Sequence, residues 1–255
     1  MPMSPSLRAC FALTLAAGLS LPLDARADAL SDLKAALVRL QGQTPIKGQI
    51  SVKSENRQNE GQDDARNDVG AAQVAFDDGP QGLRVTYPQP VLAKALQEDT
   101  AKDANPKAST PTATGLSGLA YQDVRQMTRA ADGLLRTLNR ATFKSERAEA
   151  WQGQAARVVS FDVPLRQPDK YVKKFSNLLE VWVAADGTPL AARQTQTISG
   201  RAMMVITFEM KSTEETHFTV VGERLVAVRR SSQSSGEGAG EKGRQSRQLQ
   251  LDLAS

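Results

Sequence analysis

The stretch FDDGPQGLRVTYPQP, residues 76–90, has the pattern of a β-hairpin. Apolar side chains alternate with polar ones on both sides of a short segment of glycine and proline, the residues that a reversal of the chain requires. Proline cannot donate a hydrogen bond to a neighbouring strand, so Pro88 and Pro90 are expected to end the second strand. The stretch predicts an antiparallel pair of strands with one apolar face, formed by Phe76, Leu83, Val85 and Tyr87.

Similar alternation recurs along most of the chain and predicts about ten short strands in sequential order. It is visible at residues 46–53, before the hairpin, and it is clearest in MMVITFEMK, residues 203–211. An antiparallel sheet of this many strands does not stay flat, so it is expected to curl into a half-open barrel. The strands expected after the hairpin are 143–151, 155–163, 178–185, 189–198, 202–211, 216–221, 224–230 and 247–253.

Two segments have the spacing of amphipathic helices. Residues 28–40 place leucines three or four positions apart, and residues 116–138 carry a longer stripe of the same kind. These two helices are expected to cover the concave face of the sheet. The predicted fold class is therefore α+β, mainly antiparallel β.

Three polar segments lack an apolar period and are predicted to be flexible loops. They are residues 54–70, the Lys-, Asp- and Thr-rich residues 97–115, and the Gly/Ser tract 231–246. Segments of this composition bury too little surface to offset the entropy lost on ordering. Residues 28–255 are predicted to form a single domain that includes these loops.

The amino terminus has the features of an export signal. Arg8 precedes an apolar run that is too short to cross a bilayer comfortably, and the small-x-small pattern ARA follows at residues 25–27. Residues 1–27 are therefore predicted to be a signal peptide. The mature chain is expected to begin near Asp28, in the periplasm, with no stable membrane span.

The composition offers little for catalysis, metal binding or nucleic-acid binding. The net charge is only +4, and no basic cluster is interleaved with aromatic residues. Cys10 lies within the predicted signal peptide, and His217 is the only histidine. A single histidine without cysteine cannot supply the ligands of a typical zinc site. Asp77 and Asp78 are interpreted as turn formers rather than as paired catalytic carboxylates. We expect no enzyme activity, no cofactor and no nucleic-acid partner.

Three features together resemble a known family. They are the amino-terminal amphipathic helix of an exported chain, the pattern F-x-x-x-P-x-G-L-R-V-x-Y-x-x-P at 76–90, and LEVWVAADGTPLA at 179–191. This combination resembles the periplasmic lipoprotein carriers of the LolA-like superfamily. The resemblance implies an incomplete antiparallel barrel, closed by helices over an apolar cavity that accommodates acyl chains. The chain departs from those carriers at Gly79, where arginine is common, and at Leu83, where an aromatic residue is common.

Two functions remain open at this point. The first is a soluble periplasmic carrier or binding protein for lipid or lipoprotein acyl chains. The second is a non-enzymatic envelope adaptor or sensor with the same scaffold and a packed interior, which binds envelope proteins through strand edges or through residues 54–70 and 231–246. An apolar pocket of several hundred cubic ångströms favours the carrier. For that carrier, the expected ligand-binding residues are Phe76, Leu83, Val85, Tyr87, Val181, Val183, Ile206, Phe208 and Met210.

Overall fold

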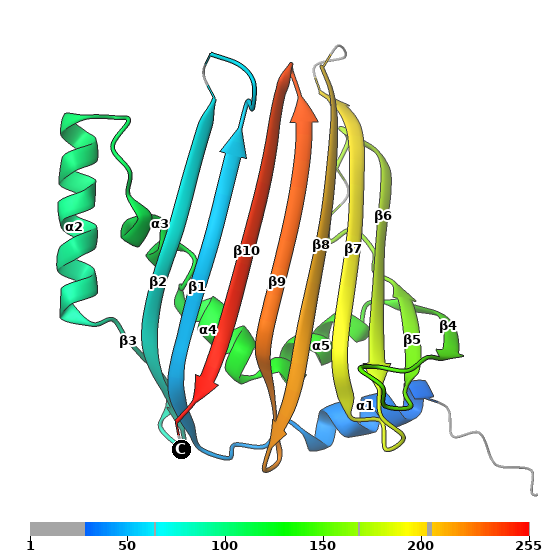
Figure 1. The fold of residues 1–255 in the computed structure, drawn as a ribbon. Helices are drawn as coiled ribbons and strands as arrows, with labels where there is room; N and C mark the ends of the chain where they lie inside the picture. Colours follow the sequence, from blue (N-terminus) through cyan, green and yellow to red (C-terminus); the bar gives the residue numbers. More distant parts are fainter. Residues whose placement is uncertain (1–28, 64, 168, 203–205, 255) are drawn as a thin grey trace, which may run out of the picture.

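The computed structural model describes residues 29–63, 65–167, 169–202 and 206–254. The predicted signal peptide lies outside the described residues. Within them, ten strands form one antiparallel sheet that remains open, and five helices accompany it (Figure 1). The prediction of a mainly antiparallel, open sheet of about ten strands is confirmed.

The strands follow one another across the sheet nearly in chain order. They are β1 (Ile46–Gln58), β2 (Arg66–Gly79), β3 (Gly82–Thr86), β4 (Thr142–Ala148), β5 (Arg157–Asp162), β6 (Val172–Val183), β7 (Pro189–Ala202), β8 (Ile206–Val221), β9 (Arg224–Gly238) and β10 (Glu241–Leu253). Their order in the sheet is β3-β2-β1-β10-β9-β8-β7-β6-β5-β4. Among the described strands, the one pairing between strands distant in sequence is therefore that of β1 with β10, the third and fourth of the ten, while β3 and β4 form the edges of the sheet.

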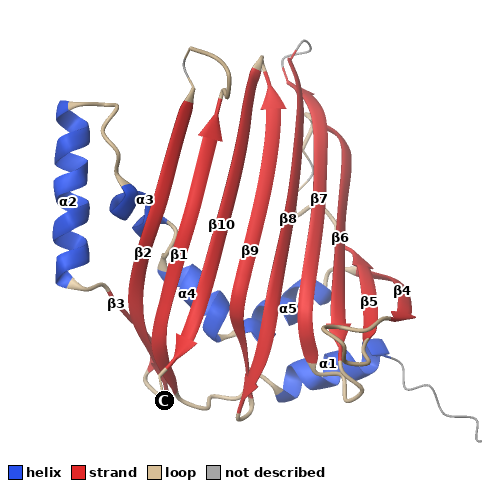
Figure 2. Cartoon of the chain, in the orientation of Figure 1, coloured by secondary structure: helices blue, strands red, loops and turns tan. Residues whose placement is uncertain are grey.

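All the helices but one cross the middle and lower parts of the sheet (Figure 2). They are α1 (Ala29–Arg39), α2 (Gln89–Ala104), α3 (Pro111–Ser117), α4 (Tyr121–Thr128) and α5 (Ala130–Leu138). Figure 2 shows α3, α4 and α5 in succession across the sheet, with α1 near its lower edge and α2 standing apart beyond β2 and β3. The upper halves of β7, β8, β9 and β10 extend beyond α1, α4 and α5 (Figure 2).

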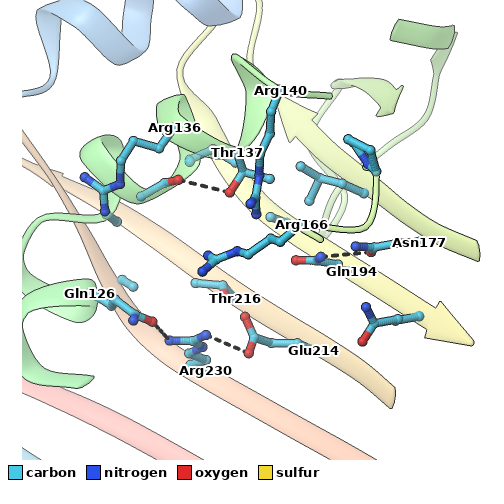
Figure 3. Close-up of a pocket in the computed structure, with 18 of the residues that line it drawn as sticks. Gln126, Arg136, Thr137, Arg140, Arg166, Asn177, Gln194, Glu214, Thr216 and Arg230 are labelled. Carbon is cyan, nitrogen blue, oxygen red and sulfur yellow. Dashed lines mark hydrogen bonds and ion pairs between the residues drawn. The ribbon is translucent and has the colours of Figure 1, made fainter. Parts of the chain in front are cut away.

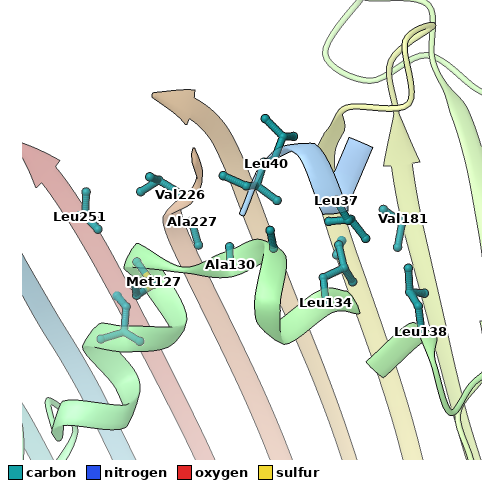
Figure 4. Packing of buried hydrophobic residues seen from close by; sticks show 14 of the residues in the cluster. Leu37, Leu40, Met127, Ala130, Leu134, Leu138, Val181, Val226, Ala227 and Leu251 are labelled. Atoms are coloured by element: carbon teal, nitrogen blue, oxygen red, sulfur yellow. The ribbon is translucent and has the colours of Figure 1, made fainter. Parts of the chain in front are cut away.

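The space between these helices and the sheet is filled by side chains. Leu37 of α1, Met127 of α4 and Leu134 of α5 are buried in one continuous cluster with Val181 and Val226 of the sheet (Figure 4). Burial of a side chain of this size stabilises the fold by about 1.5–3 kcal/mol relative to leaving it in water. The part of the sheet that the helices cover is therefore a packed core.

The segments predicted as flexible loops are mainly regular structure. Strands β1 and β2 run through much of 54–70, and β9 and β10 run through 231–246 with only Ala239 and Gly240 between them. Segment 97–115 contains the second half of α2 and the start of α3. The strand segments were missed because their side chains are polar on both faces, so no apolar alternation marks them. Pairing with the neighbouring strands satisfies their backbone groups.

Two further element predictions were wrong. Residues 116–138, expected as one helix, contain the end of α3, all of α4 and all of α5, with breaks at Gly118 and Arg129. Residues 202–211 and 216–221, expected as two strands, belong largely to the single strand β8. The prediction of two helices also missed α2, because Pro88 and Pro90 begin this helix as well as ending the hairpin.

Candidate binding cleft

The residues predicted to line an acyl-chain cleft do not come together in one place. Six of them belong to the packed core or lie against it. Those fully enclosed are Phe76, Val181 and Val183. Those partly buried against the core are Leu83, Val85 and Tyr87. The hydroxyl of Tyr87 donates a hydrogen bond of 2.7 Å to the carbonyl of Leu119, just before α4.

The other three predicted residues lie on β8, beyond the helices. Ile206 and Phe208 are half-buried, and Met210 is 53% exposed. Ile206 and Phe208 line a hollow of about 930 Å³ at the far end of the sheet, together with charged side chains such as Lys174 and Glu241. These residues are therefore accessible, at a distance from the helix-covered core.

A separate cleft of about 860 Å³ opens beside the core (Figure 3). It lies between α4 and α5 on one side, the segment 164–167 on another, and strands β6 to β9 below. None of the nine predicted residues is among the described residues that line it. Its apolar surface is formed by Ala130, Leu134, Pro164, Leu165, Phe175, Leu179, Ala192, Phe218 and Ala227.

The polar surface of the cleft is dominated by arginine. Arg136 and Arg140 come from α5 and the residues after it, and Arg166 comes from the segment that follows β5. Figure 3 shows the side chains of Arg140 and Arg166 reaching toward each other, whereas that of Arg136 extends along the helix wall. In the described chain, no carboxylate lies within ion-pair distance of any of these three guanidinium groups. Sequence reasoning missed them because Arg136 and Arg140 have the appearance of an ordinary solvated helix face.

A fourth arginine is already neutralised. Arg230 of β9 donates a hydrogen bond of 2.7 Å to the carboxylate of Glu214 on β8 and another to the side-chain oxygen of Gln126 on α4. The described lining therefore has four arginines and one carboxylate, a net charge of four minus one, or +3. The cleft is suited to a molecule that carries negative charge.

Amide side chains complete the lining on β6 and β7. Gln194 donates a hydrogen bond of 2.8 Å to Asn177, which lies on the neighbouring strand, and Gln196 lies two residues further along β7 on the same face. Amides can both donate and accept hydrogen bonds but do not act as nucleophiles or strong bases. The described part of the lining therefore supplies groups for binding, with no paired nucleophile and base.

Gly133 of α5 keeps the wall of the cleft open. It lines the cleft, and a Cβ atom added at this position would have no neighbour within 4 Å. Glycine costs about 0.5–1 kcal/mol relative to alanine inside a helix, so its presence here weakens α5. What the glycine provides at this position is unfilled space.

Strand register extends the apolar surface away from the cleft. Phe175 lines the cleft and pairs with Ile198 of β7, which pairs with Met210 of β8, which pairs with Gly236 of β9. Side chains directly opposite one another in a sheet lie on the same face. The row Phe175–Ile198–Met210 is therefore an apolar strip on the cleft side of the sheet. Phe208 follows two residues beyond Met210 on the same face.

A buried ion network holds the helix layer to the sheet next to the cleft. Asp78, at the end of β2, accepts hydrogen bonds of 2.6 and 3.0 Å from Arg129, which joins α4 to α5. Arg224, at the start of β9, lies 3.0 Å from the same carboxylate. Burial alone would raise the pKa of Asp78, but the hydrogen bonds from Arg129 and the charge of Arg224 outweigh it and hold the pKa below its ordinary value. Asp78 is therefore more than the turn former expected from the sequence.

The only histidine lies on the opposite face of the sheet. His217 is 2.8 Å from Glu215 and stands edge-on to Trp151, with ring centroids 5.3 Å apart. Trp151 packs in turn on Trp182, which belongs to a small second cluster with Val158 and Ala191. Among the described residues no group of three or more metal-ligating side chains is found. His217 therefore contributes to the packing of this face of the sheet.

Comparisons with known proteins give one structural match. No protein-family model matches the chain, and no curated protein matches it. A solved structure of a LolA superfamily protein from Nitrosomonas europaea is similar to this chain, with 13% sequence identity and a TM-score of 0.28. The match covers 90% of this chain and 96% of that one. No described helix combines the length and apolar character needed to cross a membrane.

Proposed function

We propose that this protein is a non-enzymatic binding protein that holds an amphiphilic molecule in the cleft between α5 and strands β6 to β9. The observation that carries the proposal is the cleft itself, with about 860 Å³ of space and an apolar floor facing an arginine-rich wall. Ligand sites in proteins commonly have volumes of about 300–1,000 Å³ and combine apolar walls with a few placed polar groups. An amphiphile matches both parts of this surface.

The apolar strip beyond the cleft gives the tail of such a molecule a place to lie. Glu214, in the cleft, and Phe208 are six residues apart on β8, which corresponds to about 20 Å of extended strand. An exposed hydrocarbon chain costs about 0.8 kcal/mol per methylene in water. The strip Phe175–Ile198–Met210, continued by Phe208 and Ile206, supplies partial cover along that length. In this proposal Ile206, Phe208 and Met210 remain ligand contacts, whereas the six predicted residues in or against the core support the fold.

The proposed setting is the periplasm, where an amphiphile in transit must cross water. It is supported by the signal-peptide pattern of residues 1–27. The adaptor alternative expects a packed interior, and the helix-covered core is indeed packed. However, segment 231–246, through which the adaptor would bind, lies almost wholly in the interior strands β9 and β10. Of segment 54–70, residues 54–58 lie in the interior strand β1, whereas residues 66–70 of β2 lie outside the stretch that pairs with β3. The cleft therefore favours the carrier.

The test is to fill the cleft from Gly133. Gly133→Trp and Gly133→Leu place side chains into open space, because no atom lies within 4 Å of the added Cβ. Binding of N-phenyl-1-naphthylamine, a neutral apolar fluorophore, is expected to weaken about tenfold or more, which corresponds to at least about 1.4 kcal/mol. Gly133→Ala is the matched control, and it should retain binding while stabilising the helix by about 0.5–1 kcal/mol.

Two outcomes contradict the proposal. One is unchanged probe binding by correctly folded Gly133→Trp and Gly133→Leu proteins, which would place the probe outside the cleft. The other is native mass spectrometry of protein purified from its host, combined with probe titration, that finds neither an added mass nor any binding by the wild type. That second result would leave the adaptor.

A further inference from the structure

We propose that the molecule held in the cleft has an anionic head group, a carboxylate or a phosphate, bound by Arg136, Arg140 and Arg166. This inference rests on the proposed function, because it names the chemical class of the amphiphile. It depends on where the charges of the cleft lie and on which of them are already paired.

The arginines just before α5 differ from those at the cleft. Arg125 lies 3.7 Å from Asp132, and Arg129 makes two hydrogen bonds to Asp78. Arg136 and Arg140, a few residues later, have no carboxylate partner in the described chain. The charges of the helix layer are therefore paired where they anchor the fold and unpaired where they face the cleft.

Three like charges around one cavity repel one another, and water in the open cleft screens this repulsion. A bound molecule that displaces the water removes the screening, so each unpaired cation then favours an anion more strongly. A neutral head group would leave the three cations uncompensated, and a cationic head group would add to the repulsion. An anionic group is the ligand chemistry that lowers the energy of the filled cleft.

Arginine also sets the geometry of recognition. Its planar guanidinium presents paired N–H donors that match the oxygens of a carboxylate or a phosphate. Arg136 and Arg140 approach from the helix wall, and Arg166 approaches from segment 164–167 (Figure 3). Two walls of the cleft therefore converge on the space where a head group with several oxygens would lie. The apolar floor, Leu179 and Phe218 included, lies beneath it.

The existing pair of Arg230 and Glu214 does not satisfy these arginines. The carboxylate of Glu214 receives a hydrogen bond of 2.7 Å from Arg230, and Gln126 holds the other end of that guanidinium. Glu214 thus serves to fix Arg230 at the base of the cleft. The anion that the other three arginines require must come from the ligand.

The experiment compares molecules that share one tail and differ in the head. Laurate, dodecyl phosphate and dodecyltrimethylammonium, below their micelle concentrations, and dodecanol, below its solubility limit, are titrated against the full mature chain. Displacement of N-phenyl-1-naphthylamine reports binding. At about 50 mM salt, both anions are expected to bind at least tenfold more tightly than dodecanol, and the preference should shrink at about 500 mM salt. The carboxylate and phosphate arms identify which anion fits better.

Variants connect the preference to the three arginines. Arg140→Gln with Arg166→Gln is expected to remove most of the preference for anions while dodecanol binding changes less than about twofold. Arg229→Gln is the matched control, because Arg229 is exposed and adjacent side chains of β9 point to opposite faces of the sheet. It should leave all four affinities unchanged.

The outcomes separate the two proposals. If dodecanol and the anions bind equally well, and the double variant behaves as the wild type, the head-group inference is wrong while the binding function stands. If the double variant loses dodecanol binding to the same extent as anion binding, the arginines serve the shape of the cleft and the inference is again wrong. If none of the four molecules displaces the probe, the binding function itself fails.

Discussion

The carboxylate of Asp78 lies 3.0 Å from the guanidinium of Arg224, and neither side chain is more than 2% exposed. These residues come from strands β2 and β9, which the sheet separates by β1 and β10. Arg129 binds the same carboxylate from the junction of α4 and α5. One buried carboxylate therefore connects two distant strands to the helix wall beside the cleft.

Replacing Asp78 by asparagine should destabilise the fold strongly. Asp78→Asn removes the only anion that directly contacts both Arg224 and Arg129 in the described chain, so a buried cation is left without compensation. Breaking a buried pair in this way costs about 3–5 kcal/mol. Urea denaturation at pH 7 measures the loss. Asp77→Asn is the control, because this neighbouring carboxylate is exposed and should change stability by less than about 0.5 kcal/mol. Equal effects of the two substitutions would contradict the role given to Asp78.

Acid should remove the contribution of this carboxylate. The pKa of Asp78 is held below its ordinary value in the folded protein, so the unfolded chain binds a proton first as pH falls. Its stabilising contribution is therefore present above about pH 4 and is lost as pH falls through the lower folded pKa. The difference in unfolding free energy between wild type and Asp78→Asn should shrink between about pH 4 and pH 2. A difference that stays constant over this range would rule out ionisation of Asp78 as its source.

Gly187, in the turn between β6 and β7, should tolerate alanine poorly. It has a φ of +80°, and an added Cβ would collide with the backbone carbonyl of Asp32 in α1. Gly153 is a matched control, since its φ is +82° but no atom lies within 4 Å of an added Cβ. Gly153→Ala should cost about 1–2 kcal/mol from backbone strain alone. Gly187→Ala should cost about 1–3 kcal/mol more, from overpacking against α1. Thermal melts of both variants provide the comparison.

Limited trypsin digestion should cut between α2 and α3 before it cuts the Gly/Ser tract. Lys107 is exposed in the connection after α2, whereas Arg244 lies in β10 with partners on both sides. A protease needs an extended, unpaired substrate, so the ladder around Arg244 must open first. Lys107→Gln should delay the first cut, and Arg244→Gln should not. A first cut at Arg244 would restore the original prediction that 231–246 is a flexible loop.

The elements predicted correctly from the sequence are those with one buried face and one exposed face. Val74 and Phe76 recur at every second position of β2 because one side of that strand is packed under helices. The upper parts of β9 and β10 have no such side, since the sheet extends there beyond the helices, and a segment such as SSQSSGEG then has the composition of a loop. Helix α2 was missed for a related reason: within it only Ala95 is buried.

The cleft was harder to predict because distant segments form it. Asp132 precedes Arg136 by four residues, the spacing of an ordinary ion pair on a helix surface, so the sequence does not mark Arg136 as unpaired. In the structure Asp132 lies 3.7 Å from Arg125 instead. Arg166 and Glu214 join Arg136 only through the order of the strands in the sheet. The residues predicted from apolar periodicity to line a cleft mostly belong to the packed core. Strands that face a core and strands that face a cavity show the same alternation of apolar and polar residues, so periodicity does not distinguish them.

The pairing of β1 with β10 has a consequence for how the protein acquires its shape. These strands are separated by nearly two hundred residues, so their ladder cannot form until residues 241–253 have become available. Until then β1, β2 and β3 constitute a small sheet with an open edge, and β9 presents another. Contacts between such distant segments make folding slow and leave unpaired edges exposed to other chains. A newly made chain therefore has a late, vulnerable stage, at which a chaperone that covers strand edges would raise the yield of native protein.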